Sequence, residues 1–287
     1  MFESIPVSPL RRLPALLLTA TVLCAPACAQ PIQASLPPAS TAATTAAARP
    51  DAGTQPPSGP VAATAPETTP APVPPGPTLP AGYEAWSATA RNQLTAYSAP
   101  DPGAEAVASF RDHNEFGDPQ TFRVVEEARG PRGGVWYHVF LPIQPNGATG
   151  WVRMRDVVIA GQDQRLLVDL SERTMQRFVR GVEVGRWRVA IGARATPTPE
   201  GASYVWTVWT PDRGNHDEYG AGVLGMASMS PTLSDWEGGV PRIAIHGATR
   251  PSDLGSAVSH GCIRMLDDDL RPLLTSVPLG TPVDVVA

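Results

Sequence analysis

The chain has 287 residues, a formal net charge of −5 and 42% hydrophobic residues, which is enough apolar material for a packed core in one or two domains. Its acidic balance and the lack of a dense Lys/Arg run argue against a protein that binds nucleic acid or an anionic membrane mainly through charge. We therefore expect no nucleic-acid partner, and a neutral or zwitterionic substrate.

The first 29 residues are typical of an export signal. Arg11 and Arg12 precede the apolar run LPALLLTATVLCAPA, which is too short to span a bilayer. Residues 27–29 form an A-x-A cleavage site, whereas the four residues that end at Cys28 make an imperfect lipoprotein box. We favour simple cleavage, so a membrane anchor is expected only if Cys28 is lipidated. The prediction is an exported protein of the periplasm or cell envelope, whose single remaining cysteine is Cys262.

Residues 30–82 consist almost entirely of Pro, Ala, Thr, Ser and Gly, as in STAATTAAARPDAGTQPPSGP. Such a segment has little apolar area to offset the entropy lost on ordering. It is predicted to be a disordered linker.

Short strand signals separated by turn clusters follow in residues 85–160. This density of strands favours a small β-barrel. The pieces LTAYSAPDPG, VWYHVFLP and PNGATGWV resemble a bacterial SH3-like domain, a module that is frequent in wall-associated proteins. His138 lies inside a predicted strand and is interpreted as a structural residue. The expected strands are 92–96, 106–110, 120–126, 134–141 and 150–153.

A second, larger β pattern runs over residues 164–287. QRLLVDLSERTMQRFVRGVEVGRWRVAIG predicts two or three strands joined by turns, ATPTPEG a rigid turn, and ASYVWTVWT an alternating strand. RIAIHG is a short buried strand that ends at His246. DDDLRPLLTSV predicts a short helix, with one of residues 267–269 as its N-cap and Pro272 in its first turn. The predicted fold class is therefore all-β, or mostly so, with one or two short helices.

Cys262 lies in VSHGCIRM, two residues after His260. A lone thiol outside the cytoplasm is either inert in the core or chemically used, and a neighbouring imidazole lowers the pKa of a thiol. Two histidines compete to be the base for such a nucleophile. His260 shares a face with Cys262 if the segment is extended, whereas His246, directly before Gly247, ends a strand where its side chain can face a pocket. Local spacing alone leaves this choice open.

The blocks IHG at 245–247 and SHGCIRM at 259–265 resemble the signature of the L,D-transpeptidases of the YkuD family. The resemblance extends to TPTPEG, to YGAGVLGMASMS and to VPLGTPVDVV, and covers residues 164–287. It implies an antiparallel β-sandwich with the cysteine in a cleft under a flexible flap. One difference is Arg264, which stands where many members have Asn, although Arg occurs there in the YkuD-like branch.

The resemblance also implies roles for individual residues. Cys262 is the nucleophile and His246 the proton donor and acceptor, for which the Gly247 backbone carbonyl is the expected orienting group. The amides of Gly261 and Cys262 are natural donors to an oxyanion. The expected shell around the thiol consists of Ser259, His260 and Gly261. The candidate substrate contacts are Arg264, Tyr219 and His216.

The implied reaction is acyl transfer on peptidoglycan. The thiolate attacks the L,D peptide bond after the third residue of a tetrapeptide stem, D-Ala leaves, and an amine of a neighbouring stem or of a protein takes the acyl group. The product is a 3-3 cross-link or a protein attached to the stem. No metal or organic cofactor is implied, since a zinc site made of His246, His260 and Cys262 has no fourth ligand at a recognisable spacing.

Other functions remain open at this level. An L,D-carboxypeptidase would share the same acyl-enzyme. A wall cysteine peptidase of the NlpC/P60 type also occurs with SH3-like modules, but that family places its cysteine before its histidine along the chain. A non-catalytic wall-binding protein is a further alternative, against which the intact Cys262 and His246 argue.

Overall fold

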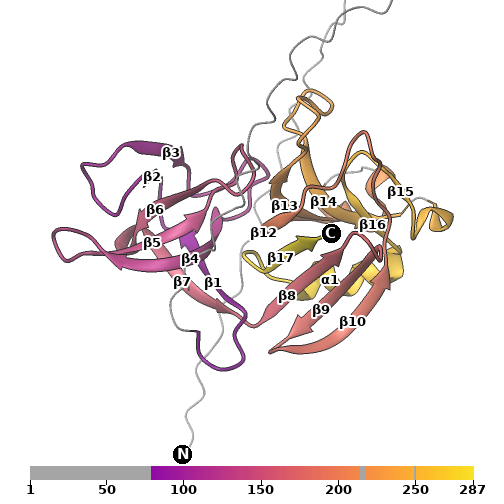
Figure 1. Cartoon of the computed structure of the whole chain (residues 1–287), viewed down its shortest axis with the longest axis horizontal. Helices are drawn as coiled ribbons and strands as arrows, with labels where there is room; N and C mark the ends of the chain where they lie inside the picture. The colour runs from indigo at the N-terminus through magenta and orange to yellow at the C-terminus, as the bar shows by residue number, and fades with distance from the viewer. Residues whose placement is uncertain (1–78, 214–216, 249) are drawn as a thin grey trace, which may run out of the picture. The chain divides into compact units, whose positions relative to one another are not determined.

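The computed structural model describes residues 79–213, 217–248 and 250–287 (Figure 1). The expected export signal and residues 30–78 of the expected linker lie outside the described residues, as does His216. None of the helices within the described ranges is long and apolar enough to cross a membrane.

The seven strands between residues 85 and 162 form one sheet, here called the N-terminal sheet, in the order β3-β2-β6-β5-β4-β1-β7. All of its pairings are antiparallel. A strand lies at each of the five expected positions, and the identification of this part as SH3-like stays a prediction. The strands are β1 (Ala85–Ala90), β2 (Leu94–Tyr97), β3 (Ala106–Phe110), β4 (Thr121–Arg129), β5 (Val135–Phe140), β6 (Thr149–Arg153) and β7 (Val157–Gln162).

Strand β5 illustrates why these residues form a buried sheet. Its sequence VWYHVF is rich in β-branched and aromatic residues, which favour strands. Tyr137 and Val139 point into a core that also holds Phe122 and Val152. His138 points the other way, stacks on the Trp151 ring at 4.6 Å and lies 3.0 Å from Glu126. These contacts match the structural role predicted for His138.

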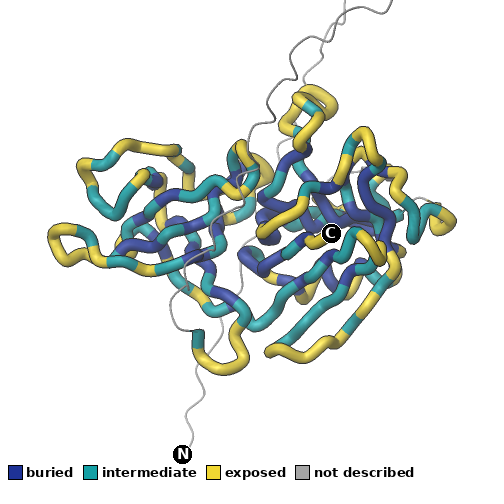
Figure 2. Tube along the Cα trace, in the orientation of Figure 1, coloured by how far each residue is buried: buried dark blue, intermediate teal, exposed yellow. Residues whose placement is uncertain are grey.

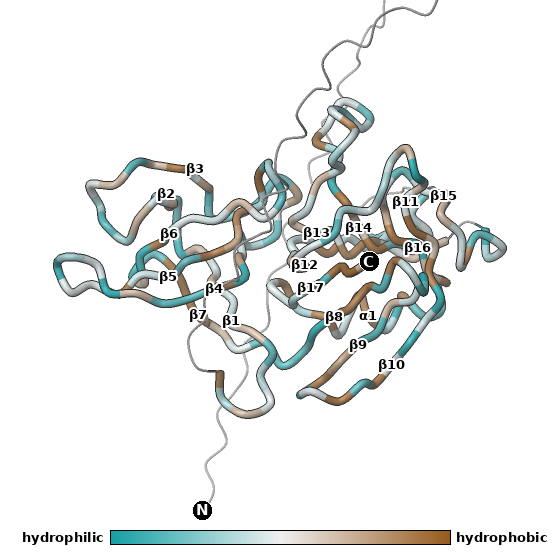
Figure 3. Tube along the Cα trace, in the orientation of Figure 1, coloured by the Kyte–Doolittle hydropathy of each residue, from teal (hydrophilic) through white to brown (hydrophobic). Residues whose placement is uncertain are grey.

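Eight later strands form a second sheet, here called the C-terminal sheet, in the order β10-β9-β8-β17-β12-β13-β14-β16, and β11 and β15 form a separate pair. Figure 2 shows its buried residues concentrated on the strands, and Figure 3 shows apolar stretches on strands such as β8 and β14. The strands are β8 (Gln164–Asp169), β9 (Thr174–Val179), β10 (Val182–Arg188), β11 (Ile191–Gly192), β12 (Gly201–Trp209), β13 (Val223–Met229), β14 (Arg242–Gly247), β15 (Ala257–Ser259), β16 (Ile263–Met265) and β17 (Pro282–Val286).

Three pairings in this part are parallel, whereas the others are antiparallel as expected. The parallel pairs are β8 with β17, β11 with β15, and β14 with β16. A parallel pair needs a connection that returns to the starting end of the sheet. For β14 and β16 that connection ends at Cys262, which directly precedes Ile263, the partner of Ile245.

One α-helix is described, α1 (Asp267–Ser276), as expected from DDDLRPLLTSV. It buries Leu270, Leu273 and Leu274, whose spacing places them on one face. The predicted start of the helix was wrong, because Leu266 is the N-cap and makes no side-chain capping bond. All three aspartates lie in the first turn, where their negative charges interact favourably with the positive end of the helix dipole.

The prediction for Pro272 was also wrong. This residue lies inside α1, beyond the first turn, where its missing N–H removes one backbone hydrogen bond. The other short helices are 3-10 turns: η1 (Met154–Asp156), η2 (Pro211–Arg213), η3 (Asp217–Tyr219) and η4 (Pro251–Asp253).

Candidate active site

The parallel pairing of β14 with β16 brings the histidine and cysteine motifs together. Its register sets Ile245 opposite Ile263 and His246 opposite Arg264, and Cys262 directly precedes this strand. Ile245 and Ile263 are both fully buried, so their packing holds the register in place. His246 and Cys262 thereby line one cavity of about 100 Å³. Other residues that line it are Tyr219, Trp236, His260 and Arg264.

His246 is buried, with 4% of its surface exposed, and its Nδ1 lies 2.9 Å from the Gly247 carbonyl oxygen. A carbonyl only accepts hydrogen bonds, so Nδ1 carries the proton and Nε2 keeps its lone pair. Burial lowers the pKa of His246 to about 4, and the Arg264 charge adds to this effect, while the bond to Gly247 opposes it. The imidazole is therefore neutral at pH 7 and able to accept a proton through Nε2.

Cys262 is partly buried, and its thiol donates toward the Arg242 carbonyl oxygen at 3.9 Å. Burial raises the pKa of the Cys262 thiol, although a backbone hydrogen bond from Ala244 and the Arg264 charge both oppose this shift. This corrects the expectation that the neighbouring imidazole lowers the pKa of the thiol, since a neutral imidazole supplies no positive charge. The resting pair is a thiol beside a neutral base.

The segment before Cys262 is held by the side chain of Ser259, which is buried. Its Oγ donates to the Cys262 carbonyl at 2.5 Å and accepts the Gly261 N–H at 3.1 Å. Gly261 has φ +119° and an ideal Cβ there would lie 2.8 Å from the Ile243 Cδ1, so this position favours glycine. The Gly261 amide is thus already bonded, which corrects its expected role as an oxyanion donor and leaves the Cys262 amide.

Two threonines of ATPTPEG, which were not among the predicted site residues, also hold this segment. Thr196 Oγ1 donates to the Ser259 carbonyl at 3.0 Å. Thr198 Oγ1 donates to the Gly261 carbonyl at 2.8 Å and accepts the Gly192 N–H at 2.9 Å. Two hydroxyls two residues apart in a rigid turn were the available signal, but the carbonyls to which they donate lie more than sixty residues away in sequence.

Aromatic side chains lie beside the two catalytic candidates. The Tyr219 ring meets His246 edge-on at 5.2 Å between centroids. Trp236 lies 5.1 Å from the His260 ring, and its Nε1 donates to the Tyr219 hydroxyl at 3.4 Å. His260 is exposed, in contrast to the buried His246. Trp236 was not predicted, because its spacing from the motifs carries no signal.

Arg264 lines the same cavity while it also braces the chain. Its Nη1 lies 3.5 Å from Asp253 Oδ2, and its backbone exchanges two hydrogen bonds of 2.9 Å with Ala190. Its positive charge disfavours protonation of His246 and favours the thiolate of Cys262. Within the part of the chain that the structure describes, no three His, Cys, Asp or Glu side chains form a group suited to a metal ion.

Burial of His246 makes the stability of the protein depend on pH. Its folded pKa is about 4 and its ordinary value is 6.5, so between these values the unfolded chain binds a proton that the folded chain does not. We expect the free energy of unfolding to begin falling near pH 6.5 and to lose about 3 kcal/mol by pH 4. Urea unfolding at pH 7, 5.5 and 4 measures this loss.

The His246→Gln variant isolates the contribution of this histidine. Other groups titrate in the same range, and they do so in both proteins. We expect the loss of stability between pH 7 and 4 to be smaller in the variant. An identical pH dependence in the two proteins would contradict the buried neutral imidazole.

Residues 163–285 match the family model of the YkuD L,D-transpeptidase catalytic domain. A Bacillus licheniformis protein provisionally named as the L,D-transpeptidase YkuD is 33% identical over 121 residues, which are 42% of this chain and 64% of that protein. A Salmonella typhimurium protein provisionally named as the L,D-transpeptidase ErfK/SrfK is 29% identical over 161 residues, which are 52% of each chain. The chain thus spans between half and two thirds of the length of these curated relatives.

Among solved structures, an L,D-transpeptidase from Mycobacterium tuberculosis H37Rv matches 58% of this chain and 90% of that chain, with 17% sequence identity and a TM-score of 0.36. This likeness is too low to bear on the site.

Proposed function

Because residues 163–285 form a YkuD L,D-transpeptidase catalytic domain, we propose that the chain is a cysteine-dependent peptidoglycan L,D-transpeptidase. The observation that carries the proposal is the parallel pairing of β14 with β16, which puts Cys262 and His246 in one cavity. A nucleophile, a base and a group that orients the base are the requirements of acyl transfer. Gly247 supplies the third through its carbonyl oxygen.

In the first half-reaction the Cys262 Sγ attacks the carbonyl carbon of the L,D bond after the third stem residue. His246 Nε2 takes the thiol proton during the attack, because the raised pKa of the thiol keeps it protonated at rest. The Cys262 amide donates to the developing oxyanion. When the C–N bond breaks, the imidazolium returns its proton to the amine of D-Ala, and a thioester remains on Cys262.

In the second half-reaction an amine of another stem, or of a protein, attacks the thioester carbonyl. His246 takes a proton from this amine, the C–S bond breaks, and the sulfur regains the proton from His246. The acceptor therefore decides whether the product is a 3-3 cross-link or an anchored protein. Water in place of the amine gives the tripeptide, as in an L,D-carboxypeptidase.

Three further side chains are proposed to contact the substrate. Arg264 offers a guanidinium to a stem carboxylate at the cavity wall, although its contact with Asp253 competes for that role. Tyr219 and His260 line the same cavity and are joined through Trp236. The place of action is the periplasm or cell envelope, reached by export, with a membrane anchor only if Cys28 is lipidated.

The test is the reaction of the purified protein with disaccharide-tetrapeptide, followed by mass spectrometry. We expect loss of D-Ala together with a cross-linked dimer whose mass equals two substrates minus one D-Ala. Formation of tripeptide without dimer would mean that water, and not an amine, attacks the acyl-enzyme, so the protein would be a hydrolase with the same intermediate. The proposed activity would be contradicted if the tetrapeptide kept its D-Ala and no product carried a stem attached to a protein.

A further inference from the structure

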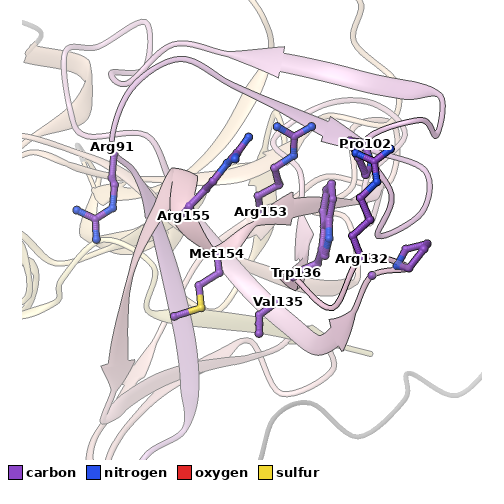
Figure 4. A pocket seen from close by; sticks show the side chains of 11 residues that line it. Arg91, Pro102, Arg132, Val135, Trp136, Arg153, Met154 and Arg155 are labelled. Atoms are coloured by element: carbon purple, nitrogen blue, oxygen red, sulfur yellow. The ribbon is translucent and has the colours of Figure 1, made fainter.

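A second concave surface, here called the arginine groove, lies on the N-terminal sheet (Figure 4). It has a volume of about 710 Å³, within the range of sites for small ligands. Its eleven lining residues include four arginines and neither aspartate nor glutamate. It shares no residue with the cavity of Cys262.

Arg153 is held in the groove by two aromatic rings. Its guanidinium carbon lies 5.4 Å from the centroid of Tyr97 and 5.4 Å from that of Trp136, and these two rings contact each other edge-to-face at 5.7 Å. Two aromatic faces attract a guanidinium without using its N–H donors. No carboxylate of the described residues pairs with Arg153, so its donors are available to a ligand in a fixed position.

Two further arginines extend this row of charge. Arg132 and Arg155 are exposed; Arg132 pairs with no acid in the described chain, and Arg155 only approaches its neighbour Asp156, at 3.6 Å. In Figure 4 Arg132, Arg153 and Arg155 extend toward the same side, whereas Arg91 points away from them. Arg91 is tied to the backbone, since its Nε donates to the Val157 carbonyl at 3.0 Å.

Figure 4 shows Arg132, Arg153 and Arg155 side by side along the groove, and this arrangement fits several separate anions on one ligand. A guanidinium fork matches a carboxylate through two parallel hydrogen bonds. The net charge of −5 on the whole chain disfavours a long polyanion, which would extend beyond this patch. Val135 and Met154 add apolar surface that can contact the backbone and the aliphatic parts of the side chains of a peptide.

We propose that the arginine groove binds a short acidic peptide through two or more of its carboxylates. The peptide lies along Arg132, Arg153 and Arg155, and its carboxylates accept hydrogen bonds from their guanidinium groups. Binding at this surface is separate from the chemistry at Cys262 and involves no covalent step. The proposal does not depend on the transferase activity, because its test measures binding alone.

The test is isothermal titration of the purified protein with the capped peptide Glu-Ala-Glu-Ala and with its matched partner Gln-Ala-Gln-Ala. We expect the glutamate peptide to bind at least about tenfold more tightly than the glutamine peptide, and the difference to shrink as salt is added. Equal affinity for the two peptides, or binding of neither, would overturn the proposal.

Two variants locate the binding surface. The double variant Arg132→Gln/Arg155→Gln, which removes two exposed side chains, is expected to weaken binding of the glutamate peptide about tenfold. Arg111→Gln changes an exposed arginine elsewhere in the same part of the chain and is expected to leave binding unchanged. Equal weakening by both changes would mean non-specific attraction and would overturn the proposal. A further titration uses tripolyphosphate in place of the peptide. Binding of tripolyphosphate without binding of the peptide would assign the groove to phosphate and would also overturn the proposal.

Discussion

Replacing Cys262 by alanine is expected to lower the rate of D-Ala release and of dimer formation by at least about 10⁴-fold. The thioester has no other sulfur to form on, since the other two cysteines of the sequence lie in the expected export signal. The side chain is small and partly buried, so the fold is expected to survive the change. Product masses from disaccharide-tetrapeptide and a urea unfolding curve measure the two effects together.

Cys262→Ser is the matched control for shape. It keeps a hydroxyl where the thiol was, but an alcohol holds its proton far more strongly, so His246 is not expected to activate it. We therefore expect this variant to be inactive and as stable as the wild type. Turnover by purified Cys262→Ala that matches the wild type would remove Cys262 from the mechanism.

Gly247→Ala is expected to lower the free energy of unfolding by about 3 kcal/mol and to reduce transfer at least about tenfold. An added Cβ would lie 2.9 Å from both the Gly220 Cα and the Tyr219 carbonyl oxygen, and 2.0 Å from Asp267 Oδ1. The Asp267 side chain can rotate, but the two backbone atoms cannot yield without moving η3. Because the Gly247 carbonyl holds His246 Nδ1, a shift of this turn reorients the imidazole.

The control for this prediction is Gly134→Ala. No atom lies within 4 Å of a Cβ added there, and its backbone needs no left-handed conformation. We expect this variant to match the wild type in its urea midpoint and in its rate of transfer. If Gly247→Ala matched Gly134→Ala in both measurements, the close contacts around Gly247 would affect neither the stability of the protein nor its rate of transfer, and the prediction would be wrong.

Much of the strand pattern was predictable because it depends on local side-chain spacing. RIAIHG forms β14, with five of its six residues buried, and all of ASYVWTVWT except its last residue lies in β12. The leucines of α1 likewise follow helical spacing. The start of α1 was not predictable in the same way. Each of three consecutive aspartates is a suitable N-cap by residue type, so the sequence does not single one out. In the structure β16 ends at Met265, and the next residue, Leu266, is the N-cap.

The thiol chemistry shows where residue types mislead. A cysteine beside histidines predicts a thiol of lowered pKa, yet burial raises the pKa of Cys262 and lowers that of His246. Both shifts favour the neutral forms, since a buried charge loses its hydration. The Gly261 amide is similar: glycine next to a nucleophile suggests a free donor, but Ser259 Oγ already accepts from it.

The sequence by itself determined the mostly β character of the chain and the YkuD-type motifs around His246 and Cys262, because strand periodicity and short motifs are local properties. Only the tertiary structure decided that β14 and β16 pair in parallel, that His246 is buried while His260 is exposed, and that four arginines line one groove. Each of these depends on contacts between residues far apart in the chain, and the burial of a group, which sets its pKa, exists only once those contacts form.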